Sequence, residues 1–238
     1  MNKRAILGLM LAMILPFTGY VLVKYYSDTN VHMPGRYFFD RVDTVKKNGK
    51  ISIDTIWHSA KNITFTNQLG KTVTLDSLKG KILVIDFFFT RCPTICPGLA
   101  KSMKKLQDSY PNGKDTIVQF ISISIDPDHD SVTQLRNFAN RYTSNHDSWW
   151  FVTGNKKEIY DFAFDELKAS VADTEVDTAF IHTTKFFLLD RERVIRGFYD
   201  GFDTVQQANL VRDIPMLMLE KKRKKSFKEF LDELFGRS

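Results

Sequence analysis

The chain has 238 residues, of which 43% are hydrophobic and 26% charged, a composition typical of one packed domain with additional segments. This composition excludes a wholly disordered chain, a collagen-like repeat and a multi-pass membrane protein. Only two cysteines are present, Cys92 and Cys96, which excludes a disulfide-stapled scaffold and a four-thiolate zinc site.

The net charge of +6 lies at the two ends of the chain. Residues 1–26 carry +3 and residues 221–238 carry +4, so the body between them has a net charge of −1. A protein that binds the phosphate backbone needs a basic surface on its folded domain. We therefore expect no nucleic-acid partner.

The amino-terminal segment is predicted to be a membrane anchor. Residues 5–23 contain no charged side chain, and as a helix they would span ~28 Å, close to the hydrocarbon thickness of a bilayer. Because Lys3 and Arg4 precede this run, we expect a single transmembrane helix in the inner (cytoplasmic) membrane, with the domain on the periplasmic or extracytoplasmic side. The alternative is a cleaved signal peptide, but no small-x-small cleavage site follows the run.

Four regions are expected along the chain. Residues 1–26 form the anchor, 27–50 a stalk and the start of a hairpin, 51–220 the main domain, and 221–238 a basic carboxyl-terminal helix. The apolar face of that last helix fits contact with a membrane or a partner, or packing against its own domain.

The main domain is predicted to be a three-layer α/β sandwich with a mixed central sheet, because strands alternate with helices along it. The run over 82–89 is almost wholly apolar, as in a strand buried on both faces. Asp130 is predicted to cap a helix, and Pro215 to kink or restart another. The expected hairpin strands are 42–45 with 51–56 and 63–65 with 73–75, the later strands are 116–125, 149–152, 185–189 and 194–199, and the helices are 98–110, 131–142, 156–168 and one after Asp203.

The cysteines form a C-x-x-x-C motif at the carboxyl end of the buried strand, where α/β sheets place ligand sites. Pro97 fits the first position of a helix, which puts Cys96 at the N-cap and Cys92 in the preceding loop. The helix terminus would stabilise thiolate at both sulfurs, with Arg91 as an additional cation. Two such thiolates close a disulfide or hold a soft cation such as Cu(I); the alternative is a pair of inert, buried cysteines.

Four stretches of the main domain form a recognisable set: Phe89–Gly98, Ile121–Asp130, Ile181–Asp190 and Arg196–Gly201. Together they resemble the Sco/SenC family of thioredoxin-like, membrane-anchored copper proteins that assemble cytochrome c oxidase. The resemblance implies that Cys92, Cys96 and His182 are copper ligands, for Cu(I) with room for Cu(II). The family usually has an acid just before its histidine, whereas this chain has Ile181, so the group that orients the imidazole ring differs. The resemblance covers residues 65–219.

Asp86 and the histidines require separate consideration. Asp86 lies in the apolar strand, six positions before Cys92, where thioredoxins carry a buried carboxylate that relays protons. A structural aspartate bonded to a neighbouring strand is the equal alternative. Spacing alone gives no histidine pair a metal signature, and the acids around His129 are interpreted as a turn and a helix cap.

The resemblance implies a metallochaperone that delivers copper to the dinuclear copper centre of cytochrome c oxidase subunit II. Such a protein needs an upstream copper donor and a thiol reductant. The alternative is an enzyme, a thiol-disulfide oxidoreductase that reduces cysteines of the oxidase subunit or of other exported proteins. A peroxidase of the same fold is disfavoured because Phe89 replaces the threonine that peroxiredoxins carry three residues before the cysteine.

Overall fold

A computed structural model describes residues 3–30, 33–47, 50–110, 116–172 and 183–220 of the chain. It divides the chain into two units, Met1–Met33 and Pro34–Ser238. His182 and the predicted carboxyl-terminal helix at 221–238 lie outside the described residues.

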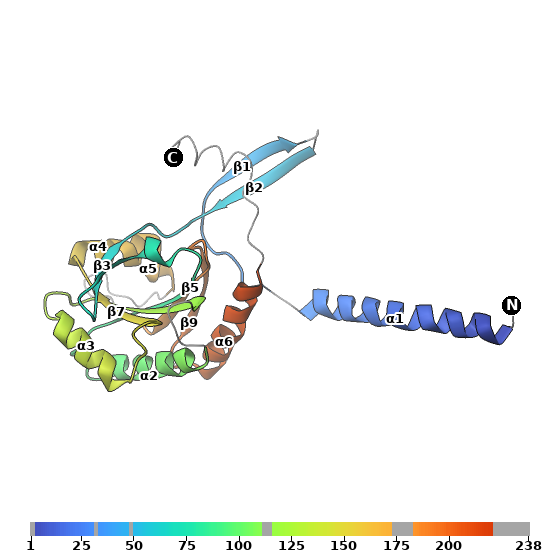
Figure 1. Ribbon diagram of the computed structural model, residues 1–238. Coiled ribbons are helices and arrows are strands. Elements are labelled where there is room, and N and C mark those ends of the chain that lie inside the picture. Colours follow the sequence, from blue (N-terminus) through green and yellow to red (C-terminus); the bar gives the residue numbers. More distant parts are fainter. Residues whose placement is uncertain (1–2, 31–32, 48–49, 111–115, 173–182, 221–238) are drawn as a thin grey trace. The chain divides into compact units, whose positions relative to one another are not determined.

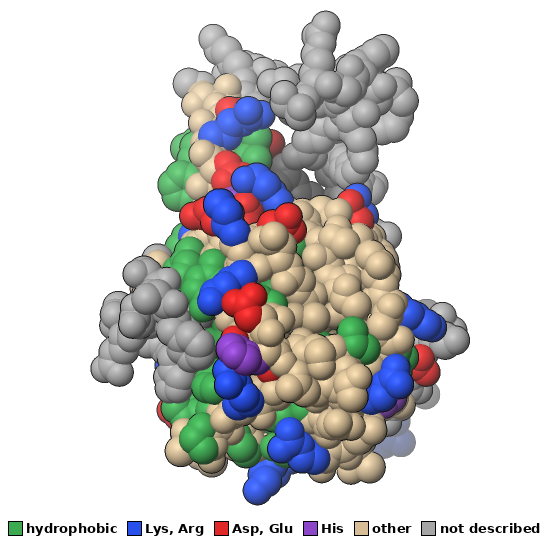
Figure 2. All heavy atoms as spheres, turned by 90° about the vertical axis from the view of Figure 1, so that its left-hand side faces the viewer, with side chains coloured by type: hydrophobic (Ala, Val, Ile, Leu, Met, Phe, Trp, Pro, Cys, Tyr) green, Lys and Arg blue, Asp and Glu red, His purple; other side chains and the backbone are tan. Residues whose placement is uncertain are grey.

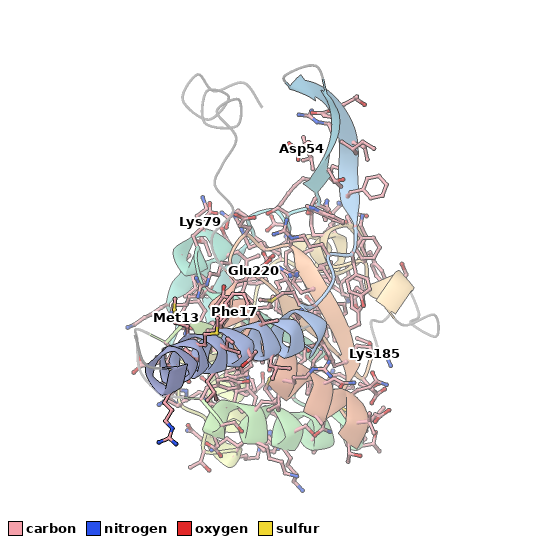
Figure 3. All side chains as sticks on the ribbon, turned by 90° about the vertical axis from the view of Figure 1, so that its right-hand side faces the viewer. Met13, Phe17, Asp54, Lys79, Lys185 and Glu220 are labelled. Atoms are coloured by element: carbon pink, nitrogen blue, oxygen red, sulfur yellow. The ribbon has the colours of Figure 1, made fainter. Side chains whose placement is uncertain are left out.

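The first unit contains one helix, α1 (Lys3–Asn30), with Pro16 inside it. Its described apolar side chains are exposed, among them Met13 at 70% and Phe17 at 67% (Figure 3). The sequence predicts a transmembrane helix over 5–23, but across the described residues no helix is long and apolar enough to cross a membrane.

The second unit is built on a seven-stranded mixed sheet with the order β4-β3-β7-β6-β5-β8-β9 (Figure 1). β5, β6 and β7 run parallel to one another, whereas β3, β4, β8 and β9 pair antiparallel to their neighbours. β5 is buried along its whole length, as the apolar run in the sequence predicts. The strands are β3 (Thr64–Asn67), β4 (Thr72–Thr74), β5 (Ile82–Phe88), β6 (Val118–Ser124), β7 (Trp149–Thr153), β8 (Lys185–Leu189) and β9 (Ile195–Asp200).

Helices cover both faces of this sheet, which confirms the predicted three-layer arrangement (Figure 1). One core cluster joins the sheet to α2, α3 and α6, and a second joins it to η1, α4, η2 and α5. Successive side chains of a strand point to opposite faces, so Val84 and Phe88 enter the first cluster and Leu83, Ile85 and Phe87 the second. The helical elements are η1 (Leu75–Leu78), α2 (Ile95–Asp108), α3 (Val132–Arg141), α4 (Lys156–Asp161), η2 (Phe162–Glu166), α5 (Ala169–Ala172) and α6 (Thr204–Leu219).

Three helix predictions need correction. The helix predicted over 156–168 is broken into pieces, because the Leu167 N–H bonds the Phe162 carbonyl in a π-helical turn and Lys168 has a φ of 55°. Of the kink or restart predicted at Pro215, the restart is wrong because α6 continues through this residue, and the kink stays a prediction. The N-cap of α3 is Ser131, which exchanges bonds with Gln134 in a capping box, and not Asp130.

The amino-terminal hairpin forms as predicted, from β1 (Phe39–Lys47) and β2 (Lys50–Trp57). Asn48 and Gly49, where the sequence predicts the turn of this hairpin, lie outside the described residues. At its base the Tyr37 N–H donates to the Ile195 carbonyl and the His58 N–H to the Phe38 carbonyl. The Tyr37 bond ties the base of the hairpin to the edge strand β9, whereas the His58 bond lies within the hairpin.

Charged side chains are mixed on the face of the molecule shown in Figure 2, where Lys and Arg lie among Asp and Glu. The described residues also form exposed ion pairs such as Lys156–Asp128, with a distance of 3.6 Å between Nζ and Oδ2. Such exposed pairs contribute little to stability.

Candidate metal and thiol site

The two cysteines follow β5, a strand that is buried along its whole length. β5 and β6 are parallel neighbours with Phe88 opposite Ser124, so the loops after both strands begin at the same sheet edge. The Ile125 N–H donates to the Phe88 carbonyl, and the Cys92 N–H donates to the Phe89 carbonyl at 3.2 Å. The chain then turns into α2, which carries Cys96 in its first turn.

Helix α2 begins earlier than predicted. Its N-cap is Thr94, without a side-chain cap bond, and Ile95 and Cys96 are already helical. The prediction of Cys96 as N-cap is therefore wrong. Pro97 is tolerated at the third helical position because the N–H that it lacks would have no intrahelical partner there.

The two thiols differ sharply in their surroundings, although both cysteines are free and buried. Burial alone would raise the pKa of Cys92, but hydrogen bonds from Cys96 and from the N–H groups of Thr94 and Ile95 outweigh it and lower that pKa. Burial raises the pKa of Cys96, and the nearby Cys92 and Asp86 add to the rise. The prediction of thiolate at both sulfurs is thus wrong for Cys96, because the helix terminus bonds Cys92 alone.

Arg91 does not serve as the cation predicted for the thiolates. Its Nη2 donates to Asp126 Oδ2 at 2.7 Å, and His129 Nδ1 lies 2.8 Å from Asp126 Oδ1. Burial opposes ionisation of Asp126, but the bonds from His129 and Arg91 prevail and lower its pKa. Asp130, fully buried, binds Thr90 and Ser124 instead of capping α3.

Asp86 is buried, with 2% of its surface exposed, and alternation along β5 puts it on the α2 face between Val84 and Phe88. Burial raises its pKa to about 7, against a hydrogen bond from Ser122. Its Oδ1 has no hydrogen-bond partner among the described residues.

A cavity of about 10 Å³ lies beside Cys96. Thr183, which is 4% exposed and directly follows His182 in the chain, is among the residues that line it. The described residues contain no group of three His, Cys, Asp or Glu side chains arranged to hold a metal ion. His182 lies outside the residues searched.

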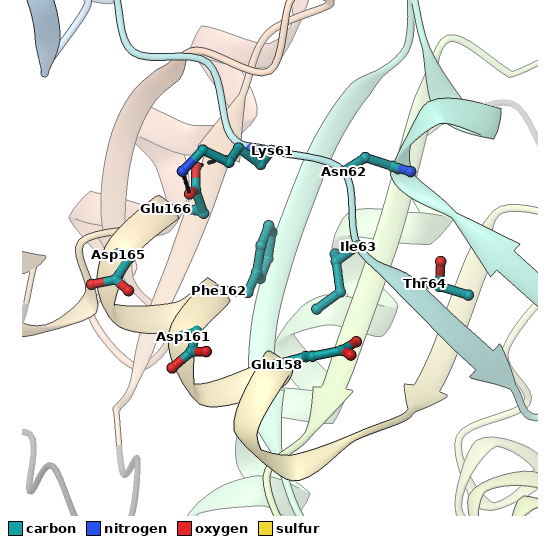
Figure 4. Close-up of a pocket in the computed structure, with 9 residues that line it drawn as sticks. All are labelled: Lys61, Asn62, Ile63, Thr64, Glu158, Asp161, Phe162, Asp165 and Glu166. Atoms are coloured by element: carbon teal, nitrogen blue, oxygen red, sulfur yellow. Dashed lines mark hydrogen bonds and ion pairs between the residues drawn. The ribbon is translucent and has the colours of Figure 1, made fainter.

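Other polar groups of the domain lie apart from the thiols. His146 precedes β7 and so stands at the amino end of the parallel strands, opposite the edge with the cysteines. A cavity of about 430 Å³ lies between the segment before β3 and α4 with η2, and in it Lys61 pairs with Glu166 (Figure 4). Its lining offers carboxylate oxygens and no thiol or imidazole, a ligand set unlike the soft one that Cu(I) prefers.

Sequence reasoning missed the contacts that Asp126 and Asp130 make with the residues before Cys92. The signal was present, because both acids follow β6 as Cys92 follows β5. The same acids also fit a turn and a cap, and only the fold shows what they bind.

Comparisons with known proteins agree with this architecture. The SCO1 protein homolog of Bacillus subtilis is 35% identical over 162 residues, which cover 68% of this chain and 83% of that protein. A structure of BsSco, described as a member of the Sco family of cytochrome c oxidase assembly proteins with a disulfide switch, has a TM-score of 0.57 and 34% identity and covers 70% of this chain and 98% of that one. A structure of Bradyrhizobium japonicum ScoI with copper bound has a TM-score of 0.51 and 26% identity, and the match covers 65% of this chain and 98% of that one.

The sequence model of the SCO1/SenC family matches residues 58–218, from the end of the hairpin to the last turn of α6. This match spans well over half of the chain and includes the C-x-x-x-C motif, the acids after β6 and the segment around His182. The chain therefore belongs to the SCO1/SenC family.

Proposed function

We propose that this chain is a copper carrier that binds Cu(I) through Cys92, Cys96 and His182 and delivers it to the dinuclear copper centre of cytochrome c oxidase subunit II during assembly. The observation that carries the proposal is that Thr183, the neighbour of His182, lines the same small cavity as Cys96. Two thiolates and an imidazole are a soft ligand set that suits Cu(I) and accommodates Cu(II). The Bradyrhizobium japonicum relative, whose structure has copper bound, supports copper as the cargo.

Delivery on this proposal is ligand exchange at copper, with no covalent bond made in a substrate. An upstream donor supplies the metal, and a thiol reductant keeps the two cysteines reduced in an exported location. The partner is an oxidase subunit, in line with the assembly role stated for BsSco.

Membrane attachment through residues 5–23 belongs to the same proposal, with the domain on the extracytoplasmic side. The uncharged run and the exposed apolar side chains of α1, such as Leu15 and Phe17, support it. Carbonate extraction of membranes tests it: the full chain should stay in the membrane pellet and a chain lacking residues 5–23 should be released. Release of both chains would remove attachment from the proposal.

An anaerobic Cu(I) titration of the reduced full chain tests the copper site. We expect one tightly bound copper in the native chain, lost in Cys92→Ser and in His182→Ala. His146→Ala is the matched control, because His146 bonds Gln68 at the opposite edge of the sheet and should leave binding unchanged. Retention of copper in His182→Ala would contradict the proposed ligand set.

The second candidate function is thiol-disulfide exchange, which the unequal thiols favour. A Cys92 thiolate attacks a partner disulfide to form a mixed disulfide and release one thiolate. Cys96 then loses its proton and attacks Cys92 Sγ, which frees the reduced partner and leaves a Cys92–Cys96 disulfide for an external thiol to reduce. Asp86, buried on the α2 face with an unpartnered oxygen, is the proposed acceptor of the Cys96 proton.

Turnover of a disulfide substrate separates the two functions. A reductase should keep its rate in His182→Ala and lose most of it in Asp86→Asn, in Cys92→Ser and in Cys96→Ser. A chain with no measurable turnover that still binds copper is a carrier alone.

A further inference from the structure

The loop after β6 binds the two residues that precede Cys92. Asp130 accepts the Thr90 hydroxyl at 2.6 Å through Oδ1 and the Thr90 N–H at 3.1 Å through Oδ2. Asp126 accepts Arg91 Nη2 at 2.7 Å. Consecutive residues of the cysteine loop are thus held by two carboxylates from the neighbouring loop.

Asp130 binds the cysteine loop and does not cap helix α3. It is fully buried, and its Oδ2 also accepts the Ser124 hydroxyl at 2.5 Å. A buried carboxylate is costly unless hydrogen bonds satisfy it, and here Thr90 and Ser124 provide them. The cap of α3 is supplied separately by Ser131 and Gln134, so Asp130 has no part in it.

The contact bears directly on Cys92, which lies two residues beyond Thr90. Its Sγ accepts the Cys96 N–H at 3.4 Å, a bond that depends on where the loop sets the sulfur against the first turn of α2. The Ile125 N–H bonds the Phe88 carbonyl, and the side chains of Asp126 and Asp130 add further bonds between the cysteine loop and the loop after β6.

We propose that Asp130, through Thr90, and Asp126, through Arg91, are positioning residues that set the Cys92 sulfur against the amino end of α2. This inference rests on the proposed role of the Cys92–Cys96 pair and assigns a function to the acids beyond the turn they make. Without the two contacts the loop samples positions in which Cys92 Sγ loses the Cys96 N–H. The reduced pair is then less stable relative to the disulfide, and the metal ligands are less well placed.

Thr90→Val in the full chain tests the inference, because valine keeps the branched shape and the backbone N–H but lacks the hydroxyl that Asp130 binds. Thr90→Ser restores a hydroxyl and is the rescue variant. Ser131→Ala is the matched control, because it removes the α3 cap one residue after Asp130 and leaves the Thr90 contact in place.

Two measurements on the metal-free, reduced chain report the position of Cys92. In Thr90→Val we expect the rate of Cys92 alkylation by iodoacetamide at pH 7 to fall about threefold and the equilibrium with glutathione to shift about threefold towards the disulfide, as loss of one hydrogen bond would give. Thr90→Ser should lie near the native values. Ser131→Ala should lower the melting temperature without changing either thiol measurement.

Native values of both thiol measurements in Thr90→Val would overturn the inference, and so would an equal change in Ser131→Ala, which would mark a general loss of stability. Asp126→Asn should shift the same two measurements, and its failure to do so would remove Asp126 from the pair. Because these measurements use no copper, they stand even if the Cu(I) titration shows that the chain carries no metal.

Discussion

The backbone N–H of Cys96 points at the sulfur of Cys92 across 3.4 Å, and this bond is one of the contacts that make the two thiols of the motif unequal. Cys96, which donates this N–H, is itself buried among apolar groups such as Leu99 and Phe88. Cys92 receives the unpaired N–H groups at the start of α2, whereas Cys96 is held in an environment that opposes its ionisation.

We expect Cys92 to react with a small alkylating reagent at least tenfold faster than Cys96 at pH 7, because the hydrogen bonds lower the pKa of Cys92 and burial raises that of Cys96. Limited alkylation of the reduced chain followed by peptide mass spectrometry measures both rates. Equal modification of the two cysteines, or faster modification of Cys96, would contradict the asymmetry.

Asp86→Asn should stabilise the protein increasingly as pH rises. The folded state raises the pKa of Asp86 from 3.8 to about 7, so the folded chain binds the extra proton between these values. The contribution of Asp86 to stability is therefore most favourable below pH 3.8 and falls as pH rises through 7, with a total cost of at most ~4 kcal/mol. Asparagine carries no charge and avoids this cost.

Urea unfolding of the native chain and of Asp86→Asn at pH 5 and pH 8 measures the effect. The difference in unfolding free energy should be larger at pH 8 by ~2–3 kcal/mol. A difference that stays constant with pH would show that Asp86 ionises normally in the fold.

Two glycines that pack near the start of α2, Gly98 and Gly201, should differ in their response to alanine. A Cβ on Gly201 would lie 2.3 Å from Leu99 Cδ2 and 3.2 Å from the Thr184 carbonyl, inside packed core, so Gly201→Ala should cost ~1–3 kcal/mol. A Cβ on Gly98 would meet only the ring of Phe202, which is 49% exposed and can turn away, so Gly98→Ala should cost under ~1 kcal/mol. Thermal unfolding of both variants compares the two losses of stability, and a larger loss in Gly98→Ala than in Gly201→Ala would contradict the prediction.

Arg196 should be the most costly charged residue to remove. It is 3% exposed, pairs with Asp190 at 2.9 Å and with Glu220 (labelled in Figure 3) at 2.5 Å, and also donates to the Pro34 carbonyl. Arg196→Met leaves buried Asp190 without its cation and should cost ~3–5 kcal/mol.

Arg36→Ala is the control for Arg196→Met. Arg36 also pairs with Glu220, at 3.5 Å, but its loss leaves Arg196 in place and should cost under ~1 kcal/mol. Denaturant unfolding compares the two variants, and similar losses would mean that the Arg196 cluster does not stabilise the fold as argued.

Much of the fold could be predicted from the sequence because its signals are local. The apolar run of β5 is long enough to require cover on both faces, and the alternation after it permits few arrangements other than a layered α/β domain. Asp203 caps α6 as its position predicts, because a cap bonds N–H groups two and three residues away. The helix over 156–168 was not predicted correctly, since the periodicity of its apolar residues does not mark the π-helical turn at Phe162–Glu166.

The sequence by itself determined the family and the candidate residues of the site: two cysteines at the end of a buried strand and an aspartate within that strand. The tertiary structure alone decided how they differ. Cys92 and Cys96 are equivalent in the motif, and only the start of α2 at Ile95 gives one sulfur the N–H groups and buries the other. Likewise Asp130 resembles a helix cap until β6 is set beside β5, because its partner Thr90 lies 40 residues away in the chain.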